Sequence, residues 1–583
     1  MMRSIACAFL LLSAWNAIPA LGAEHYEVIE EQSVPAKMRD GVVLRADIYR
    51  PKAEGRFPVL LVRTPYDKRE EAQFANQAAA RGYVVIAQDV RGRYTSEGEW
   101  YPFKHESQDG YDTVEWAATL PYSNGKVGMY GESYVGATQM LAAIAAPPHL
   151  AGIQPGVTGS NYHENWTYQG GAFEQWFDQS WTTILAENTL DRRVAKDSSA
   201  LRWAVKLPLT EYPLLDLGAV SGLADYFQDW LAHPRYDDYW KQWSIEENFA
   251  RIQVPALHVA AWYDIFQDGT LRNYLGIKAH GGSEAARNGQ RLLVVIGGHA
   301  GSGPVIGDVD FGKESVVDGD AIILRWYDYL LKGIDNGMGR EKPVKLFVMG
   351  KNIWREEPAW PLERAQEVRY YLHAAKKANT LAGDGVLSTV PPAGEPADKY
   401  LYDPSDPVPT HGGPLCCDSQ GEPPGAFDQR PAENREDVLV YTTPAFEQDT
   451  EVTGPVRLEL YASSSAVDTD FTGRLVDVWP NGYAQNLTEG ILRARYRDSR
   501  EKAELMNPGQ VYKFNLSLWS TCNVFLAGHK LRLEVSSSNF PRFDRNLNTG
   551  QEPGSSASFV KAANMVYHDR AHPSALLLPV VGH

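Results

Sequence analysis

The chain has 583 residues, with 56 Lys and Arg against 73 Asp and Glu, so its net charge is −17. This length is too great for one ordinary hydrophobic core and predicts several domains. Hydrophobic residues at 44% and charged residues at 22% are ordinary for a globular protein, which excludes disorder, collagen and coiled coil as the main class. The acidic surplus argues against nucleic acid or an anionic membrane as a partner.

The N-terminus has the pattern of a signal peptide. Arg3 precedes an apolar run over 5–12, small residues occupy 20–23, and charged residues begin at Glu24. We therefore expect residues 1–23 to be removed and the protein to be exported, to the periplasm or the medium. No other stretch approaches the ~20 apolar residues of a membrane span, so we expect no association with a membrane.

The mature chain would keep Cys416, Cys417 and Cys522. Export permits disulfides. Neighbouring residues lie closer together than an ordinary bridge requires, so we expect Cys416 or Cys417 to pair with Cys522, with unpaired thiols as the alternative. No Cys/His spacing resembles a zinc site, and we expect neither a metal nor a cofactor.

Strand-like and helix-like segments alternate over residues 24–150. Short apolar or alternating runs predict strands at 42–49, 58–63, 83–89 and 126–130. Helical patterns occupy 74–81, 111–120 and 134–144. This alternation predicts a mostly parallel, doubly wound sheet with helices on both faces.

The alternation stops over residues 151–248, which are rich in Trp and Tyr. Helical patterns at 185–206 and 223–231 indicate an inserted helical cap. The alternation resumes over 249–341, with strands at 256–261 and 291–296 and a helix at 320–332. Residues 24–150 and 249–341 should therefore form one α/β domain.

Residues 342–583 have a different pattern, in which short alternating runs are separated by Gly, Pro, Asn and Asp. Examples of these runs are 344–349, 456–461 and 530–535. Such a pattern is typical of an all-β sandwich. We therefore predict a second folded domain over 342–583.

Residues 131–136, with the sequence Gly-Glu-Ser-Tyr-Val-Gly, lie between a predicted strand and a predicted helix. A serine at a sharp strand-to-helix turn is the nucleophile elbow of α/β hydrolases. There the hydroxyl of Ser133 would stand clear of the sheet, and the backbone N–H of Tyr134 would point at a developing oxyanion. The pattern departs from G-x-S-x-G, because Val135 takes the place of the second glycine. The alternative is a tight turn with a capping serine.

A serine nucleophile needs a base, and the base needs an acid that orients it. In α/β hydrolases these follow the serine in the order acid then His, each just after a strand. Asp264 and His299 have these positions, so we predict a triad of Ser133, Asp264 and His299. His258 and His280 lie in or near predicted helices or strands and are expected to be structural.

The motifs resemble those of the cocaine-esterase and glutaryl-acylase group of serine hydrolases, which are relatives of the X-Pro dipeptidyl-peptidases and the α-amino-acid ester hydrolases. The segments that carry the resemblance are 62–68, 88–93, 96–98, 131–136, 262–264, 325–326, 331–333 and 538–542. The resemblance implies an α/β-hydrolase domain, an inserted helical cap and a C-terminal jelly roll. It also implies that Tyr66 donates its hydroxyl to the oxyanion, beside the backbone N–H of Tyr134.

The residues after the predicted triad aspartate bear on the acyl group. The resembled amino-ester hydrolases carry carboxylates there that hold a substrate ammonium, whereas Ile265, Phe266 and Gln267 are uncharged. We therefore expect a neutral or aromatic acyl group. Phe266 is one candidate substrate-binding residue, and the candidates in the cap are Trp166, Tyr168, Phe173, Trp176 and Phe177.

These features together predict a serine hydrolase that cleaves a small-molecule carboxylic ester, or an amide, through an acyl-enzyme intermediate. Alternatives on amide bonds are an X-Pro dipeptidyl-peptidase and a β-lactam or glutaryl acylase. A non-enzymatic alternative is a carbohydrate-binding protein whose hydrolase domain is inert.

Overall fold

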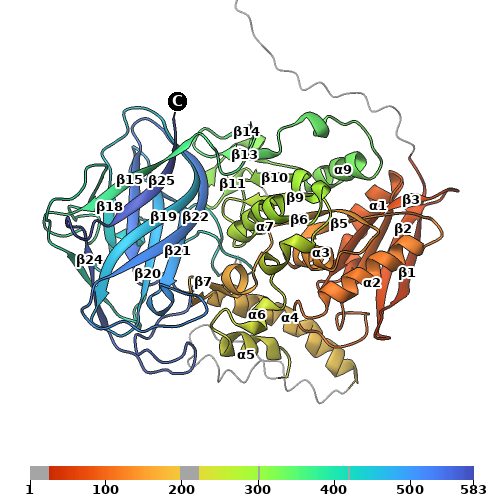
Figure 1. Cartoon of the computed structure of the whole chain (residues 1–583), viewed down its shortest axis with the longest axis horizontal. Helices are drawn as coiled ribbons and strands as arrows, with labels where there is room; N and C mark the ends of the chain where they lie inside the picture. The colour runs from red at the N-terminus through yellow and green to blue at the C-terminus, as the bar shows by residue number, and fades with distance from the viewer. Residues whose placement is uncertain (1–24, 197–221, 300–302, 418–420, 583) are drawn as a thin grey trace, which may run out of the picture.

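A computed structural model of the chain describes residues 25–196, 222–299, 303–417 and 421–582. The predicted signal peptide, 1–23, lies outside the described residues, as does the part of the predicted helix 185–206 beyond 196. Figure 1 shows a sheet flanked by helices (red to green), an all-β domain (blue), and an inserted segment below the junction of the two. No helix within the described ranges has both the length and the apolar character needed to cross a bilayer.

The larger α/β domain is built on a mixed sheet. In spatial order its strands are β1 (Val28–Lys37), β2 (Val43–Pro51), β4 (Val84–Asp89), β3 (Phe57–Thr64), β5 (Ser123–Glu132), β6 (Leu150–Gly156), β9 (Ala256–Ala261), β10 (Gln290–Val295), β13 (Val344–Val348) and β14 (Ile353–Glu357). Neighbours from β4 to β13 are parallel, and the outer pairs are antiparallel.

Helices cover both faces of this sheet. They are α1 (Ala72–Ala80), α2 (Glu106–Thr119), α3 (Tyr134–Ala145), α7 (Gln267–His280), α8 (Glu284–Asn288) and α9 (Gly319–Leu330). Alternate residues of β3 join different cores: Val59 and Leu61 pack with α2 and α3, whereas Leu60 and Val62 pack with α1 and α9. Because both faces are buried, the strand reads as a continuous apolar run.

The inserted segment lies between β6 and β9. Its elements are the π-helical turn η2 (His163–Thr167), β7 (Tyr168–Gln169), β8 (Ala172–Phe173), α4 (Gln175–Lys196), α5 (Asp225–Ala232), α6 (Asp238–Lys241) and the 3-10 helix η6 (Glu246–Arg251). Helix α4 begins well before the predicted 185. Its first turns are buried almost all round, with Trp176, Phe177 and Trp181 inside, so they show no amphipathic period.

The C-terminal all-β domain holds a single extended set of paired strands. In spatial order they are β17 (Asp398–Tyr402), β24 (Ala562–Tyr567), β19 (Thr450–Ser464), β25 (Ala575–Val581), β15 (Ala365–His373), β16 (Val386–Ser388), β18 (Leu439–Thr442), β23 (Lys530–Ser536), β20 (Asp470–Val478) and β21 (Ala484–Arg493), with β22 (Tyr512–Phe525) beside β19. A short helix, α10 (Arg430–Glu433), lies between β17 and β18 along the chain.

The predicted boundary at 342 is wrong for one strand pair. The strand predicted at 344–349 for the β-sandwich is β13, which pairs with β10 and so belongs to the first sheet. Strand β14 follows it there. Met349, the residue after β13, exchanges backbone hydrogen bonds with β22 of the all-β domain. This segment therefore joins the two domains, and its alternating sequence pattern would suit a strand of either one.

The predicted pairing of Cys416 or Cys417 with Cys522 is also wrong. Cys416 and Cys417 are bonded to each other, with Cα atoms 3.7 Å apart. Cys522 is a free thiol in β22, fully buried in the core of the all-β domain, where Thr453 donates a hydrogen bond to its sulfur at 3.1 Å. The adjacent cysteines belong to a different core, beside the cap, which puts Cys522 out of their reach.

A buried arginine ties the cap to the all-β domain. Arg542 has no exposed surface, and its guanidinium donates to Glu489 at 2.6 Å and to Gln169 at 2.9 Å. It also lies 3.5 Å from Glu174 of the cap. The positive charge of Arg542 therefore compensates the carboxylates of Glu489 in the all-β domain and Glu174 in the cap.

Replacing Arg542 with Met should therefore destabilise the protein strongly. Removing one partner from a buried ionic network leaves the other charges uncompensated, which typically costs about 3–5 kcal/mol. The measurement is the midpoint of urea denaturation. The matched control is Arg340→Met, because Arg340 pairs with Asp335 on the surface with both side chains 71% exposed. Equal midpoints for the two variants would contradict the role of Arg542.

Candidate active site

Ser133 occupies the sharp turn between β5 and α3. Its backbone is in the left-handed region, with φ 59° and ψ −128°, and its N–H donates to the carbonyl of Gly156 at 3.0 Å. A Cβ on Gly131 would come within 2.4 Å of the Val135 side chain, and one on Gly136 would lie 2.9 Å from the Gly156 carbonyl. Val135 therefore fits at the place of the second glycine because Gly131 beside it has no Cβ, and the close approach to β6 falls one residue later, at Gly136.

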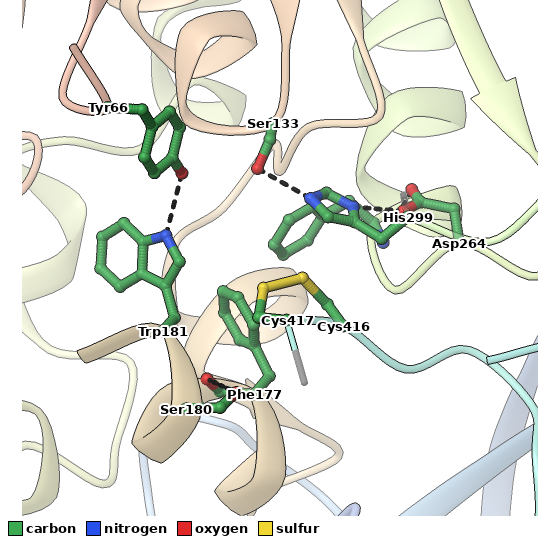
Figure 2. Close-up of a disulfide and its surroundings, with 10 residues drawn as sticks. Tyr66, Ser133, Phe177, Ser180, Trp181, Asp264, His299, Cys416 and Cys417 are labelled. Atoms are coloured by element: carbon green, nitrogen blue, oxygen red, sulfur yellow. Dashed lines mark hydrogen bonds and ion pairs between the residues drawn. A yellow bond between two sulfur atoms is a disulfide. The ribbon is translucent and has the colours of Figure 1, made fainter. Parts of the chain in front are cut away.

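The structure brings together the side chains of the predicted triad (Figure 2). His299 Nε2 lies 2.8 Å from Ser133 Oγ, and His299 Nδ1 lies 2.6 Å from Asp264 Oδ1. The other oxygen of Asp264 accepts the backbone N–H of Phe266 at 2.9 Å, and Asp264 has no exposed surface. This arrangement can pass a proton from Ser133 to His299 while Asp264 holds the imidazole.

Of the two histidines expected to be structural, His258 is buried and His280 is exposed. His258 is fully buried in β9, where Nε2 lies 2.7 Å from Gln290 Oε1. Burial lowers the pKa of His258 to about 4, so its ring stays neutral. His280 is the last residue of α7.

Tyr66 lies in the loop after β3, on the side of Ser133 away from His299 (Figure 2). Its hydroxyl oxygen accepts a hydrogen bond from the indole N–H of Trp181 at 2.9 Å. Burial raises the pKa of Tyr66, and its hydrogen-bonding contacts with Trp181 and Ser133 offset this only in part. The phenol therefore stays protonated at neutral pH and can donate to an oxygen anion beside Ser133.

Tyr134 has separate roles for its backbone and its side chain. As the first residue of α3, it has an N–H with no carbonyl one turn back along the helix. Its phenol points into a buried network instead: it donates to Glu106 at 3.1 Å and accepts from the N–H of Phe103 at 2.8 Å, while Glu106 pairs with Arg63 at 2.7 Å. Only the backbone of Tyr134 is placed to meet a substrate.

Some of the predicted aromatic wall residues gather beside His299. The ring of Phe266 meets the His299 ring edge-on at 5.0 Å between centroids. Trp166 stacks on Phe266 at 4.3 Å, and Phe177 packs edge-on against both, at 5.5 Å from Trp166 and 5.3 Å from Phe266. Trp181 completes this aromatic cluster, at 5.7 Å from Trp166.

The other predicted wall residues lie elsewhere. Among the described residues, the ring contacts of Phe173 are with Tyr168 and Phe227, in the interior of the cap. Tyr168 donates its hydroxyl to the carbonyl of Trp230 at 2.9 Å. Trp176 donates its backbone N–H to Pro541 of the all-β domain at 3.0 Å. Phe173, Tyr168 and Trp176 therefore belong to packing within the cap or at its border.

Sequence reasoning missed Trp181 and the disulfide. Trp181 lies in the part of α4 that showed no helical period, so nothing marked it as facing Ser133. The sulfur atoms of Cys416 and Cys417 lie between the Phe177 ring and the His299 side chain in Figure 2. The adjacency of the two cysteines was the available signal, and the rule for ordinary bridge geometry argued against it.

Comparisons with known proteins identify the family of this chain. The chain matches the X-Pro dipeptidyl-peptidase (S15) family over residues 40–301 and the X-Pro dipeptidyl-peptidase C-terminal non-catalytic domain over residues 336–577. The cocaine esterase of a Rhodococcus species is 36% identical, over 96% of this chain and 99% of the esterase.

Solved structures show the same fold over the whole length. An aminopeptidase from a marine-sediment archaeon (Thaumarchaeota archaeon) superposes with a TM-score of 0.79 at 25% identity, covering 100% of this chain and 99% of the other. An α-amino-acid ester hydrolase superposes with a TM-score of 0.77 at 24% identity, covering 98% and 100%. The predicted fold class, an α/β hydrolase with an inserted cap and a C-terminal all-β domain, is confirmed. The chain is thus a serine hydrolase of the X-Pro dipeptidyl-peptidase (S15) family, in the group that contains cocaine esterase.

Proposed function

We propose that this protein hydrolyses carboxylic esters of neutral or aromatic acids through an acyl-enzyme formed on Ser133. The observation that carries the proposal is the continuous set of hydrogen bonds from Asp264 through His299 to Ser133. The likeness to cocaine esterase favours an ester over an amide.

The mechanism follows from the positions of these groups. His299 Nε2 accepts the proton of Ser133 as Oγ attacks the carbonyl carbon. Asp264 accepts the N–H of Nδ1, which holds the ring in place and stabilises its cationic form. The negative charge that develops on the carbonyl oxygen is received by the Tyr66 hydroxyl and the Tyr134 backbone N–H.

The second half of the reaction uses the same groups. The leaving alcohol takes the proton from His299, which leaves the acyl group on Ser133 Oγ. His299 then accepts a proton from water, and the hydroxide attacks the acyl carbon. Collapse of this intermediate returns a proton to Ser133 and releases the acid.

The surroundings of Asp264 support an uncharged acyl group. Ile265 and Phe266 are buried and apolar. The side-chain amide of Gln267 is already hydrogen-bonded: it donates to the carbonyl of Trp262 at 3.0 Å and accepts from the N–H of Ser520, in the all-β domain, at 3.0 Å. A substrate ammonium would find no carboxylate at these positions.

Buried carboxylates of the cap are poor anchors for an N-terminal amine. Glu174 faces Arg542, and Glu164 accepts the backbone N–H of Gly170 at 3.1 Å. Burial raises the pKa of Asp178 well above its ordinary value, and the nearby Glu174 raises it further, which favours the neutral acid. These environments argue against the X-Pro dipeptidyl-peptidase alternative.

We also propose that the protein is exported. The signal-peptide pattern over 1–23 supports this, and so does the disulfide, since disulfides persist in oxidising compartments. Mass analysis of the N-terminus of protein recovered from the periplasm and the medium tests the proposal. Recovery from the cytoplasm with residues 1–23 still attached would contradict it.

Replacing Ser133 with Ala should lower ester turnover by several orders of magnitude with folding retained. The substrates should include p-nitrophenyl esters, aminoacyl esters, X-Pro anilides and glutaryl amides, assayed side by side. The matched control is Ser180→Ala, because Ser180 is a nearby serine of α4 whose hydroxyl donates to the Phe177 carbonyl at 3.1 Å. Near wild-type turnover in folded Ser133→Ala would remove the assignment of the nucleophile, and faster cleavage of the amides would overturn the ester preference.

Replacing Tyr66 with Phe keeps the ring but removes the proposed oxyanion donor. Loss of one such donor typically lowers kcat by roughly 10²–10³, with little change in substrate affinity. The matched control is Tyr94→Phe, because Tyr94 is a half-buried loop tyrosine. Tyr134 is unsuitable as a control, because its phenol has buried hydrogen bonds. If Tyr66→Phe retained full kcat, the oxyanion donor would have to be another group.

A further inference from the structure

A loop of the all-β domain reaches into the active site and carries the disulfide. Its base is closed by reciprocal backbone hydrogen bonds between Gly413 and Gly425, of 2.7 and 3.0 Å. The part of the loop that follows the disulfide packs on the residue before His299, since a Cβ on Gly298 would lie 2.9 Å from Pro424. The same part meets α4, since a Cβ on Gly421 would lie 2.4 Å from the ring of Trp176.

The disulfide itself lies beside the active site, and Figure 2 shows it between His299 and Phe177 of α4. Cys416 is only 5% exposed and belongs to the same buried cluster as Trp166, Phe177 and Phe266. Cys417 packs against that cluster but keeps part of its surface open. Figure 2 shows both sulfurs above the Phe177 ring, on the side that faces Ser133 and His299.

The disulfide has little to offer global stability. A crosslink stabilises a fold mainly by restricting the unfolded chain, and its effect increases with the length of the loop that it closes. Cys416 and Cys417 are adjacent in sequence, so their bond closes almost no loop. Its physical effect is local: the bond joins both side chains and the peptide between them in one small ring, which fixes the position of the sulfurs.

Trp181 connects the aromatic cluster to the proposed oxyanion donor, Tyr66. Trp181 packs against Trp166 and also donates its indole N–H to Tyr66. The cluster therefore adjoins the carbonyl group of a bound ester. The acyl part stays attached to Ser133 after the alcohol has left, so it is the part of the substrate that stays beside this cluster.

We propose that the Cys416–Cys417 disulfide forms a wall of the acyl pocket and selects planar aromatic acyl groups. The inference rests on the proposed esterase function. The disulfide is uncharged and polarizable, and sulfur makes favourable contacts with aromatic rings. An aromatic acyl group would lie between the disulfide and the cluster of Trp166, Phe177 and Phe266. Reduction replaces the fixed, apolar sulfur pair with separate thiols that rotate freely, so the wall is lost while the triad stays intact.

The test compares p-nitrophenyl benzoate with p-nitrophenyl acetate, which share a leaving group and differ in the acyl part. Dithiothreitol supplies the electron pair and both protons to the sulfurs and is itself oxidised to its cyclic disulfide. On reduction, the ratio of kcat/KM for benzoate to that for acetate should fall by about tenfold or more, as expected for lost contacts in an apolar pocket, and should recover on reoxidation. The double variant Cys416→Ser, Cys417→Ser should have the low ratio and no response to dithiothreitol.

Cys522→Ser is the matched control, because that thiol is buried in the other core, where burial raises its pKa to about 12. It should keep both the high ratio and the response to dithiothreitol. Peptide mapping after alkylation verifies that Cys416 and Cys417 have been reduced, and acetate turnover reports that the protein remains folded. A benzoate-to-acetate ratio that does not fall in the reduced protein or in the double variant would overturn the proposal. Activity that survives in Ser133→Ala would instead overturn the esterase assignment, whatever the ratio.

Discussion

The hydrogen bonds of the active site depend on the place where parallel strands end. Strands β5, β9 and β10 run in the same direction, so the residues that follow them meet at one edge of the sheet. Ser133 reaches His299 only because its backbone is held at a positive φ, a conformation that costs free energy in a residue with a side chain. The bond from Ser133 N–H to Gly156, at the end of β6, helps to hold that turn.

The cap and the all-β domain are attached to this same edge. Trp181 of the cap binds the Tyr66 hydroxyl, and Gln267, close behind Asp264, binds the backbone of Ser520 in β22. Arg542 of the all-β domain in turn binds Gln169 of the cap and so joins these two parts to each other. The site is therefore assembled from three parts of the chain, although its hydrogen-bonded triad comes from the sheet alone.

The sequence was sufficient where local pattern and chemistry agree. Buried runs such as 58–63 and 83–89 identified the strands, and the positions of Asp264 and His299 after strands identified groups that the structure places together. Pattern failed where tertiary packing decides. Helix α4 is buried on nearly all sides around Trp181, so it has no period to detect, and β13 has the alternation expected of either domain. The predicted cysteine pairing was wrong for two reasons. The usual Cα–Cα range of disulfides does not hold for adjacent cysteines, and the sequence does not reveal that Cys522 lies in a different core from Cys416 and Cys417.

The apolar rings around His299 affect the charges as well as the fit of the substrate. Asp264 is fully buried, and its carboxylate is supported by the His299 ring and the Phe266 N–H. Because Phe266 also packs on His299 and excludes water, the attraction between Asp264 and the imidazolium is stronger than it would be in solvent.

A change in Phe266 would thus alter turnover and specificity together. The disulfide belongs to a separate domain, and none of the hydrogen bonds that join Asp264, His299 and Ser133 involves it. A wall built from that loop allows acyl preference to change with little effect on the electrostatics of the triad. Under the proposed function, the share of acyl preference that comes from this loop can therefore vary separately from the chemistry, whereas the share that comes from Phe266 cannot.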